Sequence, residues 1–364
     1  MESRSDFLQP LLYESCEELA KSFKSLKSPR GLASLLKIPY EYLVYYVYRF
    51  PQDRKYRAFK ILKSSGGHRA ILVPNKSLKI VQRKLSQVLY SIYNPRPCVH
   101  GYVPGKSIIT NAKSHTRRKF ILNIDIKSFF KSINYGRVRG LFIAKPYCLN
   151  PPVATFIAQI CCHENHLPIG APTSPVVSNL ICSKMDSELQ RFAKEHGCFY
   201  TRYVDDMTFS INKKNLPSAL IANHGPGFSE VVLGNQLREI IEEDNGFQIN
   251  SSKIRLRHYT QKQEVTGLTV NKFVNVDRKY IRNLLATIHA WEKHGFQNTI
   301  DMYMKKYAKE SVLPGKETPN FLSYLRGKIE FVGSVRGKND LTYKKLLNKF
   351  FELKTRDSKM IRGI

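Results

Sequence analysis

Acidic residues are scarce in this sequence. Its 364 residues include 29 Asp and Glu against 59 Lys and Arg, and the formal net charge is +30. A charge of this size indicates a polyanionic partner, for which nucleic acid is the usual case. A membrane surface is the alternative partner, but the sequence has no long amphipathic basic helix to support it.

Hydrophobic runs, targeting signals and cysteine pairs are also missing. No stretch reaches the roughly 18 apolar residues of a membrane-spanning helix, and residues 1–6 lack a signal-peptide pattern. The 7 cysteines include no CxxC pair, which is typical of reduced thiols in a cytosol. Cys161, Cys162, His163 and His166 come nearest to a zinc site, but no second pair completes four ligands. We expect a cytoplasmic protein without membrane or zinc binding.

Two adjacent carboxylates, Asp205 and Asp206, stand between apolar and aromatic stretches that predict two strands. Asp is depleted in strand interiors. A tight turn explains the pair in part, but the common hairpin turns place Gly beside Asp or Asn, and none is present. We interpret the pair as carboxylates at a hairpin tip that bind a divalent metal such as Mg²⁺. A solvated turn is the alternative.

A third carboxylate is isolated in a basic region. Between Arg54 and His163 the chain has 21 Lys and Arg and one acidic residue, Asp125. Residues 120–126 alternate apolar and polar side chains, which predicts a strand with one buried face. An Asp there is costly unless it is paired or binds metal. Pairing with a nearby Lys or Arg is the alternative to a metal ligand.

Two glycine-containing stretches predict contacts with a nucleotide. Lys63 and Arg69 flank a glycine turn at residues 64–67, and such a hairpin can close over a triphosphate or be an ordinary hairpin. Gly170 and Ala171 lie in a Pro-rich stretch before a predicted helix. Their small side chains would let the backbone approach a planar ligand closely; a plain loop is the alternative.

Together these features describe a template-directed nucleotidyltransferase. Three clustered carboxylates repel one another, and two divalent cations roughly 3.5–4 Å apart would neutralise them and form a site for in-line phosphoryl transfer. Basic side chains would offset the charge that develops on the phosphates. The positive surface would carry a polynucleotide backbone.

The motifs resemble those of reverse transcriptases, in the order of that family. Residues 203–206 look like the YxDD box, and Asp125 looks like the first aspartate of the palm. The resemblance implies that Phe130 crowds a ribose 2′-OH and so favours deoxynucleotides. It also implies that the 168–175 loop packs against the incoming nucleotide and that Lys253 lies near its phosphates. Ile169 departs from the Gln often found in that loop.

Further stretches resemble bacterial retron reverse transcriptases. Asn111 and His115 match the NAxxH pattern, and Val265, Thr266 and Gly267 match the VTG pattern. Residues 324–333, with Arg326 and Lys328, are similar to the thumb. The resemblance implies that these seven residues contribute to RNA binding.

The resemblance implies an α+β right-hand polymerase with fingers, a palm of antiparallel sheet plus helices, and a helical thumb. The expected parts are an N-terminal helical region at 1–50, fingers at 51–120 with part of 135–175, palm at 121–275, thumb at 276–345 and a basic tail at 346–364.

The implied activity is RNA-directed DNA synthesis with two Mg²⁺ ions, or Mn²⁺ in their place, and dNTPs. The enzyme would copy part of a cognate structured RNA from a guanosine 2′-OH, giving multicopy single-stranded DNA joined to that RNA. A separate effector protein and a role in anti-phage defence in the bacterial cytoplasm are also expected. The alternatives are another bacterial reverse transcriptase, of the abortive-infection, intron or diversity-generating type, and a non-catalytic RNA-binding scaffold.

Overall fold

The computed structural model describes residues 11–62, 66–310 and 320–358. The chain forms two compact units. The first comprises Met1–Lys60, Ala70–Lys106 and Leu122–Leu256, and the second comprises Ile61–Arg69, Ser107–Ile121 and Arg257–Ile364. Each unit is therefore assembled from segments that are distant in the sequence.

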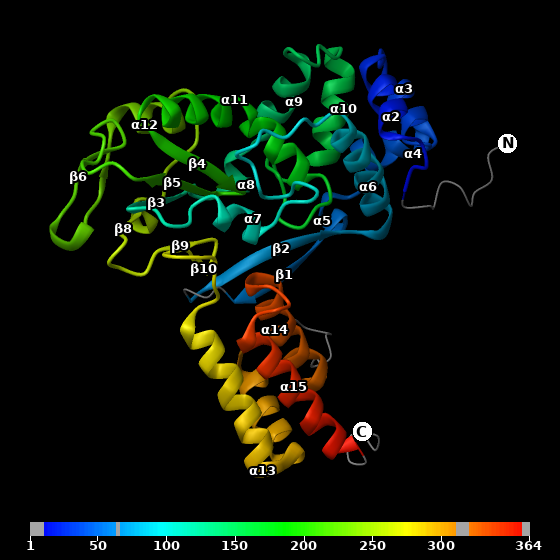
Figure 1. The fold of residues 1–364 in the computed structure, drawn as a ribbon. Coiled ribbons are helices and arrows are strands. Elements are labelled where there is room, and N and C mark those ends of the chain that lie inside the picture. Colours follow the sequence, from blue (N-terminus) through cyan, green and yellow to red (C-terminus); the bar gives the residue numbers. More distant parts are fainter. Residues whose placement is uncertain (1–10, 63–65, 311–319, 359–364) are drawn as a thin grey trace. The chain divides into compact units, whose positions relative to one another are not determined.

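The first unit is built on a four-stranded sheet in the order β4-β5-β3-β8. Its strands are β3 (Phe120–Asp125), β4 (Cys198–Tyr203), β5 (Asp206–Ile211) and β8 (Arg255–His258). β4 and β5 form an antiparallel hairpin. β3 and β5 are buried along almost their whole length, because helices cover the sheet. The longest of these is α11 (Ser174–Glu195), which packs on β4 and buries Met185 and Leu189 (Figure 1).

The remaining elements of the first unit are helices and two strand pairs, although the end of β1 and the start of β2, within Ile61–Arg69, are assigned to the second unit. The strand pairs are β1 (Tyr56–Leu62) with β2 (His68–Pro74) and β6 (Ile221–Asn223) with β7 (Val232–Leu233). The helices are α2 (Cys16–Lys24), α3 (Pro29–Leu35), α4 (Tyr40–Val44), η1 (Tyr45–Arg49), α5 (Gln52–Lys55), α6 (Lys76–Ser91), α8 (Phe129–Ser132), α9 (Tyr135–Ile143), α10 (Pro151–Cys161), η2 (Pro226–Phe228), α12 (Asn235–Glu242) and η3 (Ser251–Lys253).

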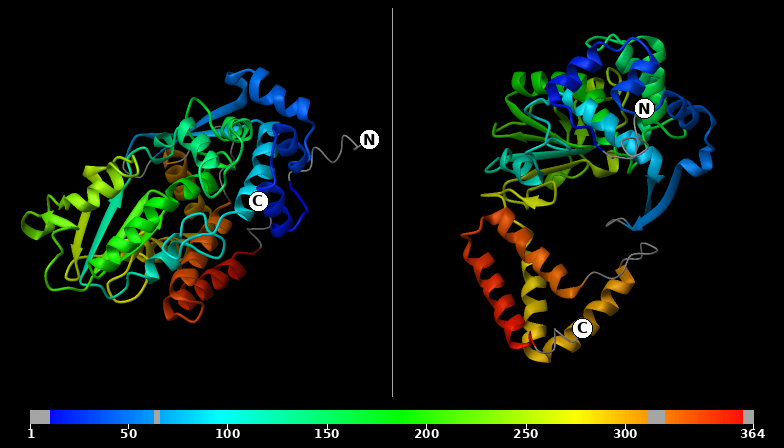
Figure 2. Two further views of the ribbon diagram at one scale, coloured as in Figure 1. Left: turned by 90° about the horizontal axis from the view of Figure 1, so that it is seen from above. Right: turned by 90° about the vertical axis from the view of Figure 1, so that its right-hand side faces the viewer.

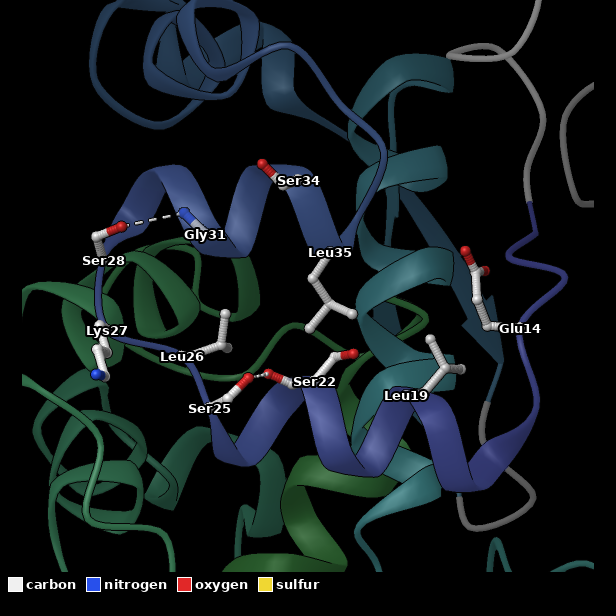
Figure 3. Close-up of a pocket in the computed structure, with 10 residues that line it drawn as sticks. All are labelled: Glu14, Leu19, Ser22, Ser25, Leu26, Lys27, Ser28, Gly31, Ser34 and Leu35. Carbon is white, nitrogen blue, oxygen red and sulfur yellow. Dashed lines mark hydrogen bonds between the residues drawn. The ribbon is translucent and has the colours of Figure 1, made fainter.

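A cavity of about 470 Å³ lies at α2 and α3 (Figure 3). Ser28 precedes α3, and its hydroxyl caps the helix by accepting a hydrogen bond from the Gly31 amide at 3.2 Å. Serine side chains contribute much of the cavity wall, together with the apolar Leu19 and Leu26. None of the predicted site residues that the structure describes lines this cavity.

The second unit is a helical bundle joined to a short helix and hairpin. The bundle contains α13 (Arg278–Glu310), α14 (Phe321–Arg336) and α15 (Leu341–Arg356), which lie against one another (Figure 2). The other elements are α7 (Ile108–Lys113), β9 (Glu264–Val265) and β10 (Leu268–Thr269). One hydrophobic core connects all of them. Trp291 is fully buried in it and donates its indole N–H to Asp357 at 2.9 Å.

The α+β class is confirmed, but two predicted boundaries fall inside elements. The boundary between residues 120 and 121 cuts β3. The basic tail predicted from residue 346 begins within α15, because Leu346 and Phe350 are buried in the bundle core and continue the helix. No helix among the described residues is long and apolar enough to span a membrane.

Candidate active site

The hairpin of β4 and β5 presents the two adjacent carboxylates at its tip. Tyr203 pairs with Asp206, so the connecting loop consists of Val204 and Asp205. Val204 adopts a positive φ of 62°, which is the conformation that glycine usually supplies at the first loop position of a type II′ turn. This explains how the chain turns sharply without the glycine that the common hairpin motifs contain.

Asp125 lies beside this tip, at the end of β3. The amide of Ile126, the next residue, donates to the carbonyl oxygen of Asp205 at 3.1 Å. On its other side, the Asp125 carbonyl accepts from the amide of Asn250 at 2.8 Å. The sheet order β4-β5-β3-β8 thus brings three acids together although about 80 residues separate them in the sequence.

The other two carboxylates act electrostatically on Asp206. Asp206 is exposed by surface area at the start of β5, but the surrounding protein desolvates its carboxyl group; this desolvation, followed by the negative charges of Asp205 and Asp125, raises its pKa to about 6. The positive charges of Lys253 and Arg255 oppose this rise. A cluster of partly buried oxygen ligands with excess negative charge has the donor chemistry that a hard divalent cation requires.

Lys253 supplies a positive charge at this cluster. Its ammonium nitrogen lies 2.8 Å from Oδ2 of Asp125, and the Asn250 side-chain amide donates to Oδ1 at 3.2 Å. Pairing with a lysine, the alternative considered for Asp125, is therefore present. Within the described residues, no three His, Cys, Asp or Glu side chains are arranged to hold a metal ion as they stand. At Oδ2 of Asp125, a bound ion would compete with the Lys253 ammonium.

Phe130 follows closely after β3, on α8. Ser128 has a left-handed φ of 51° and starts this short helix. Phe129 is buried and stacks on Phe247 with ring centroids 5.8 Å apart. The Phe130 ring is only partly buried and packs on Phe129 at 5.3 Å. Of the two rings, Phe130 is the one with surface left for a ligand.

Gly170 is required by the packing of its loop on β2. A Cβ atom there would lie 2.8 Å from both the Ile71 side chain and the Leu72 carbonyl oxygen, and the φ of Gly170 is 114°. The Leu72 amide donates to the Ile169 carbonyl at 2.7 Å. Ala171 is buried. The small residues thus have a structural explanation, and contact with a nucleotide stays a prediction.

The predicted basic hairpin is described only in part. Arg69 lies on β2 with an exposed side chain. Lys63 lies outside the described residues.

The two retron-like stretches form one module in the second unit. α7, which carries Asn111, packs on the hairpin of β9 and β10. Thr266 donates its hydroxyl to the Ile108 carbonyl at 3.2 Å. Thr266 and Gly267 form the two-residue loop with φ of 47° and 80°, and Gly267 is exposed. Asn111, His115 and Val265 are fully buried, so this structure gives them a packing role beneath the loop.

Arg326 and Lys328 lie on α14. Arg326 is exposed, with its guanidinium 5.8 Å from the Phe351 ring. Lys328 is half-buried, with its ammonium 4.5 Å from the Tyr324 ring centroid. A basic side chain over an aromatic ring is compatible with binding to the backbone and bases of RNA.

Sequence reasoning missed several polar residues around the carboxylates. Asn250 and Arg255 act on Asp125 and Asp206 as described above. Arg202 is fully buried next to the hairpin tip. An arginine between aromatic residues in a strand was the available signal, because a charge at such a position needs a partner.

Comparisons with known proteins agree on one family. The model of the family "Reverse transcriptase (RNA-dependent DNA polymerase)" matches residues 61–271. The retron Mx65 reverse transcriptase of Myxococcus xanthus is 30% identical over 309 residues, covering 79% of this chain and 69% of that protein. The retron Ec86 reverse transcriptase of Escherichia coli is 32% identical over 243 residues, covering 66% and 71%.

A solved structure is also similar. It is the telomerase of Candida albicans in complex with a TWJ fragment of telomeric RNA, with a TM-score of 0.42 and 10% identity, covering 88% of this chain and 67% of that one.

Proposed function

The chain belongs to the reverse transcriptase family, among the bacterial retron enzymes, and is an RNA-directed DNA polymerase; from this premise we propose that it copies part of a cognate structured RNA into multicopy single-stranded DNA. Synthesis starts from a guanosine 2′-OH in that RNA, and the product stays covalently joined to it. The meeting of Asp125, Asp205 and Asp206 at one end of the sheet is the observation that supports the catalytic part of this proposal.

The three carboxylates provide the ligands for Mg²⁺, or Mn²⁺ in its place. Bound there in a pair, the divalent ions supply Lewis acidity for phosphoryl transfer. Lys253 pairs with Asp125. With a metal ion at Asp125, the half-exposed Lys253 ammonium would be placed to pair with a phosphate of the incoming dNTP.

The neighbouring residues select the substrate. Phe130 presents its partly exposed ring to the sugar and excludes a 2′-OH. Gly170 and Ala171 support the nucleotide pocket through their loop, and Lys63 and Arg69 contact the triphosphate.

RNA is recognised by the second unit in this proposal. Arg326, Lys328 and the exposed loop at Thr266 and Gly267 contact the RNA. Asn111, His115 and Val265 act indirectly, because they are buried beneath that loop. The net charge of +30 provides the long-range attraction. A separate effector protein, a role in phage defence and a cytoplasmic location complete the proposal.

Two measurements test it. The first is Mg²⁺-dependent primer extension, in which Asp125→Asn, Asp205→Asn and Asp206→Asn should each reduce the rate by about 1,000-fold or more. Wild-type extension no faster than that of Asp205→Asn would contradict the assigned site.

The second is sequencing of the nucleic acid that copurifies. A defined RNA joined through a 2′-oxygen to DNA supports the retron reaction. DNA without an RNA template would point to an abortive-infection type, and an intron RNA would point to a maturase.

A further inference from the structure

The turn that carries the two carboxylates is strained at Val204. A β-branched residue with positive φ is a backbone outlier, and such a conformation persists only where surrounding contacts enforce it. Asp205 and Asp206 directly follow this residue. Whatever holds Val204 in its conformation therefore also sets the directions in which both carboxylates project.

Arg202 makes the contact that reaches this backbone. Its side chain is fully buried, and Nη1 donates to the Val204 carbonyl oxygen at 2.9 Å. Nε and Nη2 donate to the two carboxylate oxygens of Asp186 at 2.8 and 2.7 Å. A bidentate pair fixes the plane of the guanidinium as well as its position. Asp186 thereby orients the Arg202 guanidinium so that its Nη1 points toward the Val204 carbonyl oxygen.

Asn179 links the Arg202 guanidinium to Gly101, which also packs against the turn. Its Oδ1 accepts from Nη2 of Arg202 at 3.2 Å, and its Nδ2 donates to the Gly101 carbonyl at 3.0 Å. Gly101 lies against the turn so closely that a Cβ atom would come within 2.6 Å of the Val204 amide nitrogen. Asn179 and Asp186 are two turns apart on α11, and both are buried.

The other side of the turn is held by β3. The Ile126 amide donates to the Asp205 carbonyl, so the loop is bound on both sides by main-chain and side-chain donors. An ordinary buried ion pair contributes little net stability. The pair of Arg202 and Asp186 differs from an ordinary ion pair, because Arg202 also donates a hydrogen bond to the Val204 carbonyl oxygen.

We infer that Arg202, oriented by Asp186 and Asn179, is a positioning residue that enforces the conformation of Val204 and so orients Asp205 and Asp206 for binding a divalent cation. This inference rests on the proposed function, since it assumes that the two carboxylates are metal ligands. Arg202 is far too buried to touch substrate and acts only through the turn.

Arg202→Lys tests the inference. Lysine keeps the charge for Asp186 but lacks the planar fork that serves Asp186 and Val204 together. Binding of Mn²⁺ to the full-length protein, followed by electron paramagnetic resonance, should weaken by about tenfold or more, because residues that orient metal ligands typically contribute about 10–100-fold to metal affinity. The kcat for primer extension should fall similarly, while the KM for dNTP should change by less than about threefold.

A suppressor separates positioning from general destabilisation. Glycine adopts a positive φ without steric cost, so Val204→Gly should remove the strain at this position. Combined with Arg202→Lys, it should restore most of the lost Mn²⁺ affinity. Asn179→Ala, which leaves the ion pair intact, should show a smaller defect of the same kind. Phe142→Leu, a core change in α9, should lower the melting temperature without altering Mn²⁺ affinity.

The outcomes distinguish the inference from the function it rests on. If Asp205→Asn and Asp206→Asn bind Mn²⁺ like the wild type, the proposed metal site is wrong. If those variants lose the ion while folded Arg202→Lys and Asn179→Ala keep the wild-type Mn²⁺ affinity, the metal site stands and the positioning role is overturned. Failure of Val204→Gly to restore any affinity in the double variant also counts against the role.

Discussion

The ammonium nitrogen of Lys253 lies 2.8 Å from a carboxylate oxygen of Asp125. The lysine is half-exposed and the carboxylate is almost completely buried, with side-chain exposures of 48% and 10%. The lysine ammonium is therefore accessible to a ligand, whereas the Asp125 carboxylate lies in the interior. In the proposed reaction Asp125 would bind a cation and Lys253 a phosphate, so each member of the pair would have its own ligand.

Replacing Lys253 by methionine tests the phosphate role. We expect kcat/KM for dNTP to fall by about 100-fold, because one positively charged contact to the reacting phosphates is lost. Affinity for the copurifying RNA should not change. Lys184→Met on α11 removes a similarly exposed charge and serves as the control. Unaltered kcat/KM in Lys253→Met would leave the lysine as a structural partner of Asp125 alone.

Replacing Phe130 by valine tests sugar selection. The shorter side chain leaves room for a 2′-OH, so the ratio of ribonucleotide to deoxynucleotide incorporation should rise by about tenfold or more. Competition between rGTP and dGTP in primer extension measures this ratio. Phe130→Tyr keeps the bulk of the ring and should keep the discrimination. An unchanged ratio in the valine variant would argue against a steric role.

Replacing Gly101 by alanine tests the close packing against the turn. The added Cβ would lie 2.6 Å from the Val204 amide nitrogen and 2.8 Å from a Val204 methyl group, so the turn has to shift. We expect a fall in primer extension of about 100-fold, since a displacement near 1 Å costs that much. In Gly140→Ala on α9 the new methyl group meets no atom of the described residues within 4 Å, so this variant should remain active. Equal activity of the two variants would contradict the packing argument.

Replacing Asn111 by leucine tests the buried position on α7. Within the part of the chain that the structure describes, neither polar atom of the Asn111 side chain has a hydrogen-bond partner, and a buried unsatisfied amide costs about 1–3 kcal/mol. Leucine should therefore raise the thermal stability and leave RNA affinity within about twofold of the wild type. Asn111→Asp should lower stability, because it buries a charge. A large loss of RNA affinity in folded Asn111→Leu would indicate that this amide contacts RNA after local opening.

Neutralising Arg326 and Lys328 together tests the electrostatic surface of α14. The slope of log Kd for the copurifying RNA against log salt should become shallower, by about 0.7–0.9 for each phosphate contact that is lost. Glutamine at both positions removes charge and keeps length. Titrations between low and moderate salt measure the slope. A slope identical to that of the wild type would place the RNA contacts elsewhere.

The chemistry of the candidate site could be predicted from the sequence because it depends on residue types that are unusual where they occur. Asp125 stands alone among basic residues, and Asp205 and Asp206 interrupt two strong strand patterns. Short motifs around these residues were sufficient to indicate the family that the comparisons support. Local patterns of this kind are visible along one stretch of chain without any knowledge of its partners.

The interactions that set the geometry depend on the tertiary structure. Lys253 pairs with a carboxylate 128 positions away, and Gly101 packs on a turn about 100 residues further along. Nothing in either stretch specifies its partner, because hydrogen bonds and close contacts between distant segments arise only when the sheet has formed. The burial of Asn111 follows from the packing of α7 on the hairpin of β9 and β10, and the continuation of α15 past residue 346 follows from the packing of Leu346 and Phe350 in the bundle core. The sequence by itself determined which residues have the chemistry to act; the tertiary structure decided which of them meet and which are held beneath the surface.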